Sequence, residues 1–161
     1  MLPVFKIGPL SYWRTLPADQ FSSTQIAAIR QSLAAIALID EPRWSAALAG
    51  DAAAAVGVAV RSMPVERITC RTDMVMSALC LSALLGSAAA CLVLGHILKQ
   101  VGTFDPAAKR CAASWLVRQL TRHGLEARLD RTAPFGQSAR GRPSPRPDLK
   151  DHHAGIDGRR S

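Results

Sequence analysis

The chain has 161 residues, of which 48% are hydrophobic, 5% aromatic and 20% charged, with a formal net charge of +8. This composition excludes the collagen-like, disulfide-dense and acidic disordered classes, because the chain holds enough apolar residues to build a core. Alanine recurs in runs at residues 52–55 and 88–90, and a core of Ala and Leu favours closely packed helices over strands. We therefore expect an all-α protein, either a small helical bundle or a short stack of helical hairpins, with a disordered C-terminal tail.

Three segments make up the expected domain organisation. Residues 1–20 are interpreted as an extended apolar arm, 21–131 as the α-helical domain and 132–161 as a disordered basic tail rich in Pro, Gly and Arg. In the arm, Pro3 and Lys6 interrupt the apolar run that a signal peptide would need. Three aromatic residues of the arm are expected to dock on the helical body: Phe5, Tyr12 and Trp13.

Residues 22–39 carry the first long helix pattern. Ser22 and Gln25 have the spacing of a capping box, in which the hydroxyl accepts a hydrogen bond from a backbone N–H and the Gln side chain reaches back. Aliphatic residues then recur on one face of the predicted helix: Ile26, Ile29, Leu33 and Ile36. The pattern indicates an amphipathic helix packed on the core.

Two shorter helices are predicted next. Asp40 is expected to cap a helix that has Pro42 in its first turn and runs through Trp44 to Leu48. Gly50-Asp51 predicts a stop followed by a new N-cap, and a second helix over 52–61. Within that helix Gly57 and three β-branched valines leave a strand over 56–60 as an alternative.

Residues 74–98 contain no Asp, Glu, Lys or Arg, and this stretch has two interpretations. A single helix over it is long enough to span a membrane, since a span needs roughly 20 apolar residues. Ser82, Gly86 and Ala90 would then form a ridge of small residues for helix packing in the bilayer. The aliphatic residues contribute only about −4 kcal/mol to insertion, which is marginal for a span.

An internal similarity favours the other interpretation. Residues 47–56 align with 83–92 at a constant offset of 36, and in both copies a Gly is followed by Asp or Ser. This stop-then-cap pair divides the apolar stretch into two buried helices, about 74–85 and 87–100, joined by a tight turn. A period of 36 is typical of helical-hairpin repeats such as the tetratricopeptide class, and a third unit would cover 105–125. The chain lacks the aromatic and Pro markers of that class, so no binding residue is carried over.

Asp105-Pro106 predicts the start of the last helix, which is expected to end at Gly124. The predicted core face of this helix consists of Ala108, Cys111, Ala112, Trp115, Leu116 and Leu120. Basic residues occupy much of the remaining surface: Lys109, Arg110, Arg118 and Arg122.

No catalytic signature is present: the chain has no P-loop, no G-x-G-x-x-G, no G-x-S-x-G and no H-E-x-x-H. We therefore predict no enzyme, no cofactor and no metal site. The chain has four cysteines, and none has the spacing of a zinc knuckle or a redox pair: Cys70, Cys80, Cys91 and Cys111. Three of the four lie in apolar, helix-like runs and are expected to be structural. Cys91 and His96 are five residues apart, about 140° around a helix, so they do not face each other. His152-His153 is interpreted as part of the solvated tail.

The distribution of charge gives one indication of a partner. Residues 118–161 carry a net charge of +5 against +3 for residues 1–117, and nine of their ten cations are Arg, which favours bidentate contacts with carboxylates and phosphates. The candidate contacts to an anionic partner are Arg118, Arg122, Arg128 and Arg131. Nucleic acid is the less favoured partner, because acids dilute these cations and only one aromatic residue, Phe135, lies in the last 45 residues.

From these observations we expect a non-enzymatic, cytoplasmic protein-interaction or accessory module whose helical hairpins present a groove or a face to an unidentified protein partner. The alternative is a single-span inner-membrane protein with its transmembrane helix at 74–98 and a basic cytoplasmic tail. A second alternative is an accessory protein that binds nucleic acid.

Overall fold

The computed structural model describes residues 8–132, and describes side chains for residues 8–121. Every regular element in this range is helical, which confirms the all-α fold class. The elements are a 3-10 turn η1 (Pro9–Ser11), α1 (Tyr12–Thr15), α2 (Ser23–Ala34), α3 (Trp44–Leu48), α4 (Ala52–Arg61), α5 (Cys70–Leu84), α6 (Ala88–Val101) and α7 (Pro106–Thr132). Apart from Thr132, the expected tail over 132–161 lies outside the described residues.

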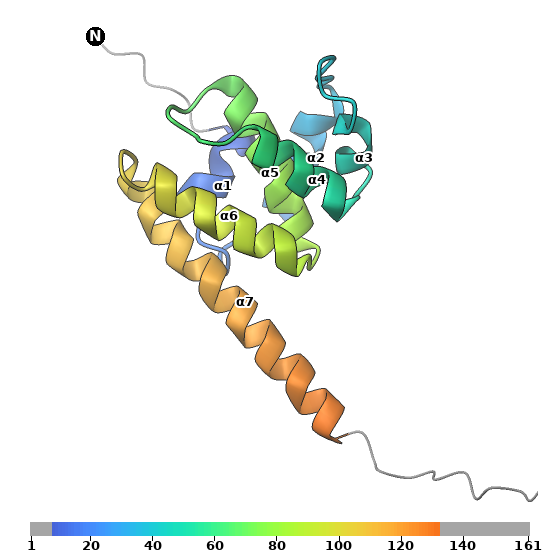
Figure 1. The fold of residues 1–161 in the computed structure, drawn as a ribbon, viewed down its shortest axis with the longest axis vertical. Coiled ribbons are helices and arrows are strands. Elements are labelled where there is room, and N and C mark those ends of the chain that lie inside the picture. The colour runs from blue at the N-terminus through green and yellow to red at the C-terminus, as the bar shows by residue number, and fades with distance from the viewer. Residues whose placement is uncertain (1–7, 133–161) are drawn as a thin grey trace, which may run out of the picture.

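Helix α5 is the centre of the bundle. It contacts η1, α1, α2, α3, α4 and α6 (Figure 1). Six consecutive residues, 75–80, are buried, and six residues cover every side of a helix with 3.6 residues per turn. A helix that is apolar all round has to be buried in this way. The charge-free stretch therefore begins in the central helix of the protein.

The two-helix interpretation of residues 74–98 is confirmed, and the single helix of the membrane alternative is wrong. Helix α5 ends at Leu84 and α6 begins at Ala88, with Gly86 between them at φ +110°. Within the described part of the chain, no helix has both the length and the apolar character that crossing a membrane requires.

The corner at Gly86 repeats the corner at Gly50 in its hydrogen bonds. Gly50 N–H donates to Ala47 O (3.2 Å) and Asp51 N–H to Ala46 O (3.0 Å). The equivalent bonds 36 residues later measure 3.1 Å and 3.1 Å, from Gly86 and Ser87 to Ala83 and Ser82. Both corners are Schellman motifs.

Each corner leads directly into the next helix, because its second residue is also the N-cap. The Asp51 carboxylate accepts from Ala54 N–H (3.0 Å), and the Ser87 hydroxyl accepts from Ala90 N–H (3.2 Å). The predicted stop-then-cap pair is therefore confirmed at both places. A third unit over 105–125 is absent, since α7 is one helix that passes through Gly124 without a corner.

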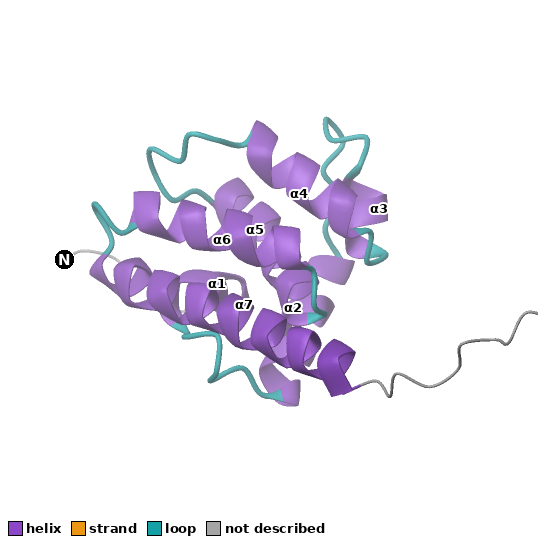
Figure 2. Cartoon of the chain, turned by 60° about the horizontal axis from the view of Figure 1, so that its bottom comes forward, coloured by secondary structure: helices purple, strands orange, loops and turns teal. Residues whose placement is uncertain are grey.

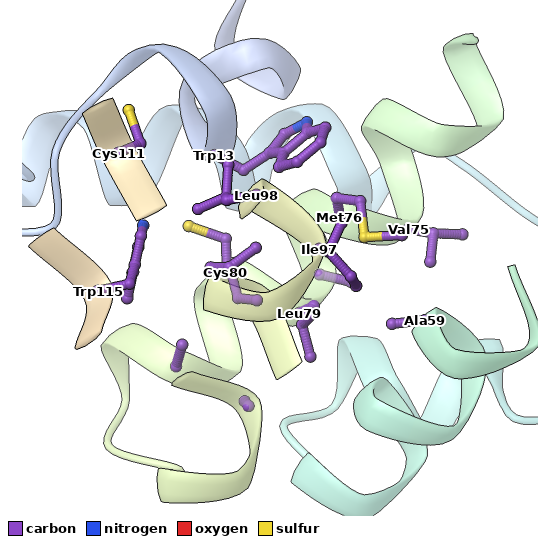
Figure 3. Close-up of a cluster of buried hydrophobic side chains, with 14 of the residues drawn as sticks. Trp13, Ala59, Val75, Met76, Leu79, Cys80, Ile97, Leu98, Cys111 and Trp115 are labelled. Carbon is purple, nitrogen blue, oxygen red and sulfur yellow. The ribbon is translucent and has the colours of Figure 1, made fainter. Parts of the chain in front are cut away.

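The large, fully buried side chains of the core come from α5 and from five helices around it, α1, α2, α4, α6 and α7. Figure 3 shows Trp13 of α1, Leu98 of α6 and Trp115 of α7 in one buried cluster with Leu79 and Cys80 of α5. Both tryptophans are fully buried, and Phe21 packs on Trp115 with ring centroids 5.9 Å apart. Fully buried aromatic side chains contribute strongly to core stability because of their large apolar area.

The N-terminal segment is not the extended arm that the sequence suggested. Residues 9–15 are helical, and Ser77 of α5 donates a hydrogen bond to Leu10 O (2.8 Å). The Trp13 indole N–H donates to the Asp73 carboxylate (2.9 Å), which also accepts from Arg14 Nε (3.2 Å). The other side of the Arg14 guanidinium donates to Asp105 (3.2 Å), the residue before α7. Arg14 thus ties α1 to the starts of two other helices.

Helix α2 has the predicted capping box but is shorter than predicted. The Ser22 hydroxyl accepts from Gln25 N–H and the Gln25 side chain accepts from Ser22 N–H. The helix ends at Ala34 rather than near residue 39. Beyond that end the Ile36 carbonyl accepts a hydrogen bond from the Trp44 indole (2.9 Å), a tertiary contact with no signal in the local sequence.

Asp40 does not cap α3, whose N-cap is Arg43 without a side-chain hydrogen bond. Asp40 instead forms an ion pair with Arg71 (2.8 Å), and the neighbouring Glu41 pairs with Arg61 at the end of α4. The Arg61 guanidinium lowers the pKa of the Glu41 carboxyl below its ordinary value. The two acids therefore hold the α2–α3 connection against α4 and α5. Residues 56–60 are helical, so the strand alternative is wrong.

Substitution of Gly50 by Ala is expected to lower the free energy of unfolding by about 1–3 kcal/mol, because an L-residue is strained at positive φ. A Cβ at Gly50 meets no atom within 4 Å, so the effect reports the backbone alone. Gly57→Ala, inside α4, is the matched control and should raise stability by about 0.5–1 kcal/mol, since a Cβ there meets only flexible Arg side chains. Urea unfolding measures both, and equal effects would contradict the corner geometry.

Asp73→Ala is expected to lower the free energy of unfolding by about 1–3 kcal/mol, because it leaves the buried Trp13 indole N–H without an acceptor. Asp19→Ala removes an exposed carboxylate from the adjoining loop and should leave stability within about 0.5 kcal/mol of the parent. Chemical unfolding followed by Trp fluorescence distinguishes them. If Asp73→Ala proves as harmless as Asp19→Ala, the anchoring role of this carboxylate is refuted.

The lowered pKa of Glu41 predicts that the protein loses stability in acid. Its pKa is lower in the folded than in the unfolded protein, so its contribution is present above the unfolded value of 4.5 and is lost as pH falls through the folded value. Glu41→Gln should therefore show a flatter fall in unfolding free energy between about pH 5 and about pH 3 than the parent. Glu66→Gln, at an exposed carboxylate, should keep the parental slope.

Candidate functional site

Helices α6 and α7 pack side by side as a hairpin (Figure 2). Several large hydrophobic side chains of this hairpin are exposed. The described residues include eight large hydrophobic side chains that are exposed, and five of these belong to residues 88–121. Four of the five lie on the helices themselves: Leu92 (52% exposed), Leu116 (44%), Val117 (60%) and Leu120 (72%). We call these four residues the leucine strip.

Helices α6 and α7 pack closely at Gly95. Gly95 has no side chain, so the Leu116 side chain packs directly on α6 there. Its Cδ2 atom lies 3.3 Å from the position that a Cβ of Gly95 would take. Leu92 lies one turn before Gly95, and Leu120 lies one turn after Leu116. Since the two helices run antiparallel, Leu92 and Leu120 extend the contact in the same direction.

Leu116 and Leu120 correct the prediction for the core face of α7. Ala108, Cys111, Ala112 and Trp115 are buried as expected, whereas the two leucines face outward. Successive residues of a helix are 100° apart, so Leu116 leaves the core when Trp115 points at its centre. The angle between Trp115 and Leu116 was the signal in the sequence that could have identified the strip.

The charged residues of α6 and of residues 106–121 in α7 are all basic. Lys99 of α6 and Lys109 and Arg110 of α7 are exposed, and no ion pair involves them among residues 8–121. The one acid between residues 88 and 121 is Asp105, whose carboxylate binds Arg14 and caps α7 through Ala107 N–H (3.0 Å). The hairpin therefore offers apolar area with an unbalanced positive field.

Of the four arginines predicted to contact an anionic partner, the structure describes the side chain of Arg118 alone. Arg118 donates to the carbonyls of Ala18 (3.2 Å) and Leu84 (3.5 Å), so this side chain joins the N-terminal segment and the end of α5 to α7. Arg122, Arg128 and Arg131 lie on α7, but their side chains fall outside the described part.

The ridge of small residues expected for membrane packing does not form. Ser82 and Ala90 are buried on two different helices, and Gly86 lies in the turn between them. The structural reason is the reversal of the chain at Gly86, which turns the faces of the two helices toward the protein interior.

A groove on another side of the bundle has a volume of about 650 Å³. Its walls are α2, the corner between α3 and α4, and the C-terminal half of α5. The lining residues are Arg30, Leu33, Ala34, Ala47, Leu48, Ala49, Gly50, Ala78, Leu81, Ser82 and Leu85. The groove is therefore apolar, with a single charged side chain at Arg30.

Three of the four cysteines are buried, and Cys70, at the start of α5, is exposed. Cys80, Cys91 and Cys111 are buried, and burial raises the pKa of the Cys80 and Cys111 thiols, which keeps them protonated and unreactive. Cys91 is buried while His96 is exposed and faces Gln100, which agrees with the expected separation of the pair. Residues 8–121 contain no cluster of side chains that could hold a metal ion, and His152-His153 lies outside the described range.

Comparison of the chain with protein-family models, with curated proteins and with solved structures finds no match.

Proposed function

We propose that this protein is an interaction module that binds an amphipathic helix with acidic flanking residues through the leucine strip. The observation that carries the proposal is the strip itself, four large apolar side chains that are exposed on the two packed helices of the α6–α7 hairpin. Contiguous exposed apolar surface rimmed by polar residues is characteristic of interaction sites. We infer a helical partner because the leucine strip lies along α6 and α7, and an amphipathic helix presents its own apolar residues as a narrow stripe.

Burial of the strip supplies a modest affinity. Covering the exposed parts of four such side chains is worth about 1 kcal/mol each, or about 4 kcal/mol in total. Association costs at least that much in lost translational and rotational freedom. Apolar contact alone therefore gives a weak complex, and electrostatic attraction has to provide the remaining affinity and the selectivity.

The positive charges of the hairpin favour a partner with negative charges. Lys99, Lys109 and Arg110 attract acidic side chains that flank the partner's apolar stripe, and they raise the rate of encounter at low salt. The same charges disfavour a second copy of this chain as the occupant, because two identical strips would bring cations together. An acidic amphipathic segment meets both requirements.

The test uses the full chain and a synthetic 20-residue helical peptide with Leu at i, i+3, i+4 and i+7 and Glu at flanking positions. We expect micromolar binding by fluorescence anisotropy, weakened at least tenfold in 0.5 M salt. Leu120→Asp is expected to weaken binding at least tenfold, since it places a charge in the strip. The matched control is Ile39→Asp, which changes a fully exposed hydrophobic residue away from the hairpin and should bind like the parent.

A second peptide with every Glu replaced by Lys separates the explanations. Equal binding of the acidic and basic peptides, or unchanged binding by Leu120→Asp, would refute the proposal. Binding of duplex DNA that is stronger than that of the acidic peptide and unaffected by Leu120→Asp would instead support the nucleic-acid alternative.

A further inference from the structure

The groove between α2, the α3–α4 corner and α5 shares no residue with the leucine strip, and its chemistry differs. We propose that it binds a single-chain amphiphile with an anionic headgroup, as a monomer, with the hydrocarbon chain in the groove and the headgroup on Arg30. This binding site is independent of the proposed interaction with a protein helix.

The size of the groove favours a small molecule over a peptide helix. Ligand pockets span about 300–1,000 Å³, and 650 Å³ lies inside that range. A helix is about 10–12 Å across, so even two turns of one occupy about 1,000 Å³. A hydrocarbon chain is narrow enough to enter the groove.

The walls match a hydrocarbon chain. Leu33, Leu48, Leu81 and Leu85 supply apolar contact, and small residues leave the space between them: Ala34, Ala47, Ala49, Gly50 and Ala78. The Schellman corner contributes to this space, because Gly50 at φ +99° has no side chain and a Cβ there would meet no atom within 4 Å. The corner that ends α3 is thus also a wall of the site.

Arg30 favours a headgroup with a negative charge. Its side chain is exposed on α2, and no ion pair involves it in the part of the chain with described side chains. None of the lining residues is acidic. A guanidinium binds a carboxylate or phosphate in bidentate geometry. Ser82 adds a hydroxyl in the lining that is 5% exposed and has no hydrogen-bond partner among the described residues.

The probes are octanoate, decanoate and dodecanoate below their micellar concentrations, titrated into the full chain by calorimetry. We expect one site per chain and an affinity that rises about fourfold for each added methylene, the ratio for burial of one CH₂ group. Nonyltrimethylammonium, which has the same nine-carbon alkyl chain as decanoate and the opposite charge, should bind at least tenfold more weakly than decanoate.

Two pairs of variants locate the site. Arg30→Gln is expected to lower the affinity for decanoate at least tenfold. Arg67→Gln, which removes an exposed cation outside the groove, should leave that affinity unchanged. Ala34→Phe places a ring in the groove from an exposed position, so it should abolish binding without loss of thermal stability. Ala53→Phe, at an exposed alanine of α4 outside the groove, is its control.

Three outcomes would overturn the proposal: equal affinity for the cationic and anionic amphiphiles, unchanged binding by Ala34→Phe, or the same affinity for Arg30→Gln and the parent. Vesicles of anionic phospholipid distinguish the source of the headgroup. Binding to vesicles without binding to monomeric decanoate would assign Arg30 to a membrane surface and would also refute the proposed site.

Discussion

A helix that is buried on every side constrains the whole structure. Residues 75–80 of α5 have no exposed face, so the chain has to place neighbours all round them. The six elements that contact α5 do this, and α6 can be one of them only because the chain reverses at Gly86. The same reversal directs the apolar residues that follow toward the protein interior, where a straight helix would have left them without cover.

Polar contacts position the outer elements on this centre. Arg14 joins α1 to the starts of α5 and α7, and Arg118 joins α7 to Ala18 and Leu84. Most of these atoms lie at helix ends, where backbone carbonyls and N-capping carboxylates are available. The apolar centre therefore sets which helices meet, and a few charged side chains at its edge set how the N-terminal segment and α7 are attached.

The same arrangement leaves two surfaces incompletely covered. Helix α7 packs on α6 and α1, so the side of the hairpin away from the core keeps its leucines exposed under a positive field. On another side, the small residues that let the α3–α4 corner form also leave a groove against α2 and α5. We propose the apolar stripe of a partner helix for the first surface, which consists of exposed side chains, and a thin hydrocarbon chain for the second, which is a groove of about 650 Å³.

Local signals in the chain were enough to place most helices and both Gly corners, since capping hydroxyls, positive-φ glycines and apolar periodicity act within a few residues. They failed where distant residues intervene: Trp44 binds the Ile36 carbonyl beyond the early end of α2, Asp40 pairs with Arg71 instead of capping α3, and Trp13 draws the N-terminal segment into helical turns on the core. Neither candidate surface could be predicted from the sequence, although Leu116 and Leu120 were assigned to a helix face and Leu33 to another. Exposure of a side chain depends on how a helix is rotated against its neighbours, and that rotation is decided by the packing of the assembled bundle.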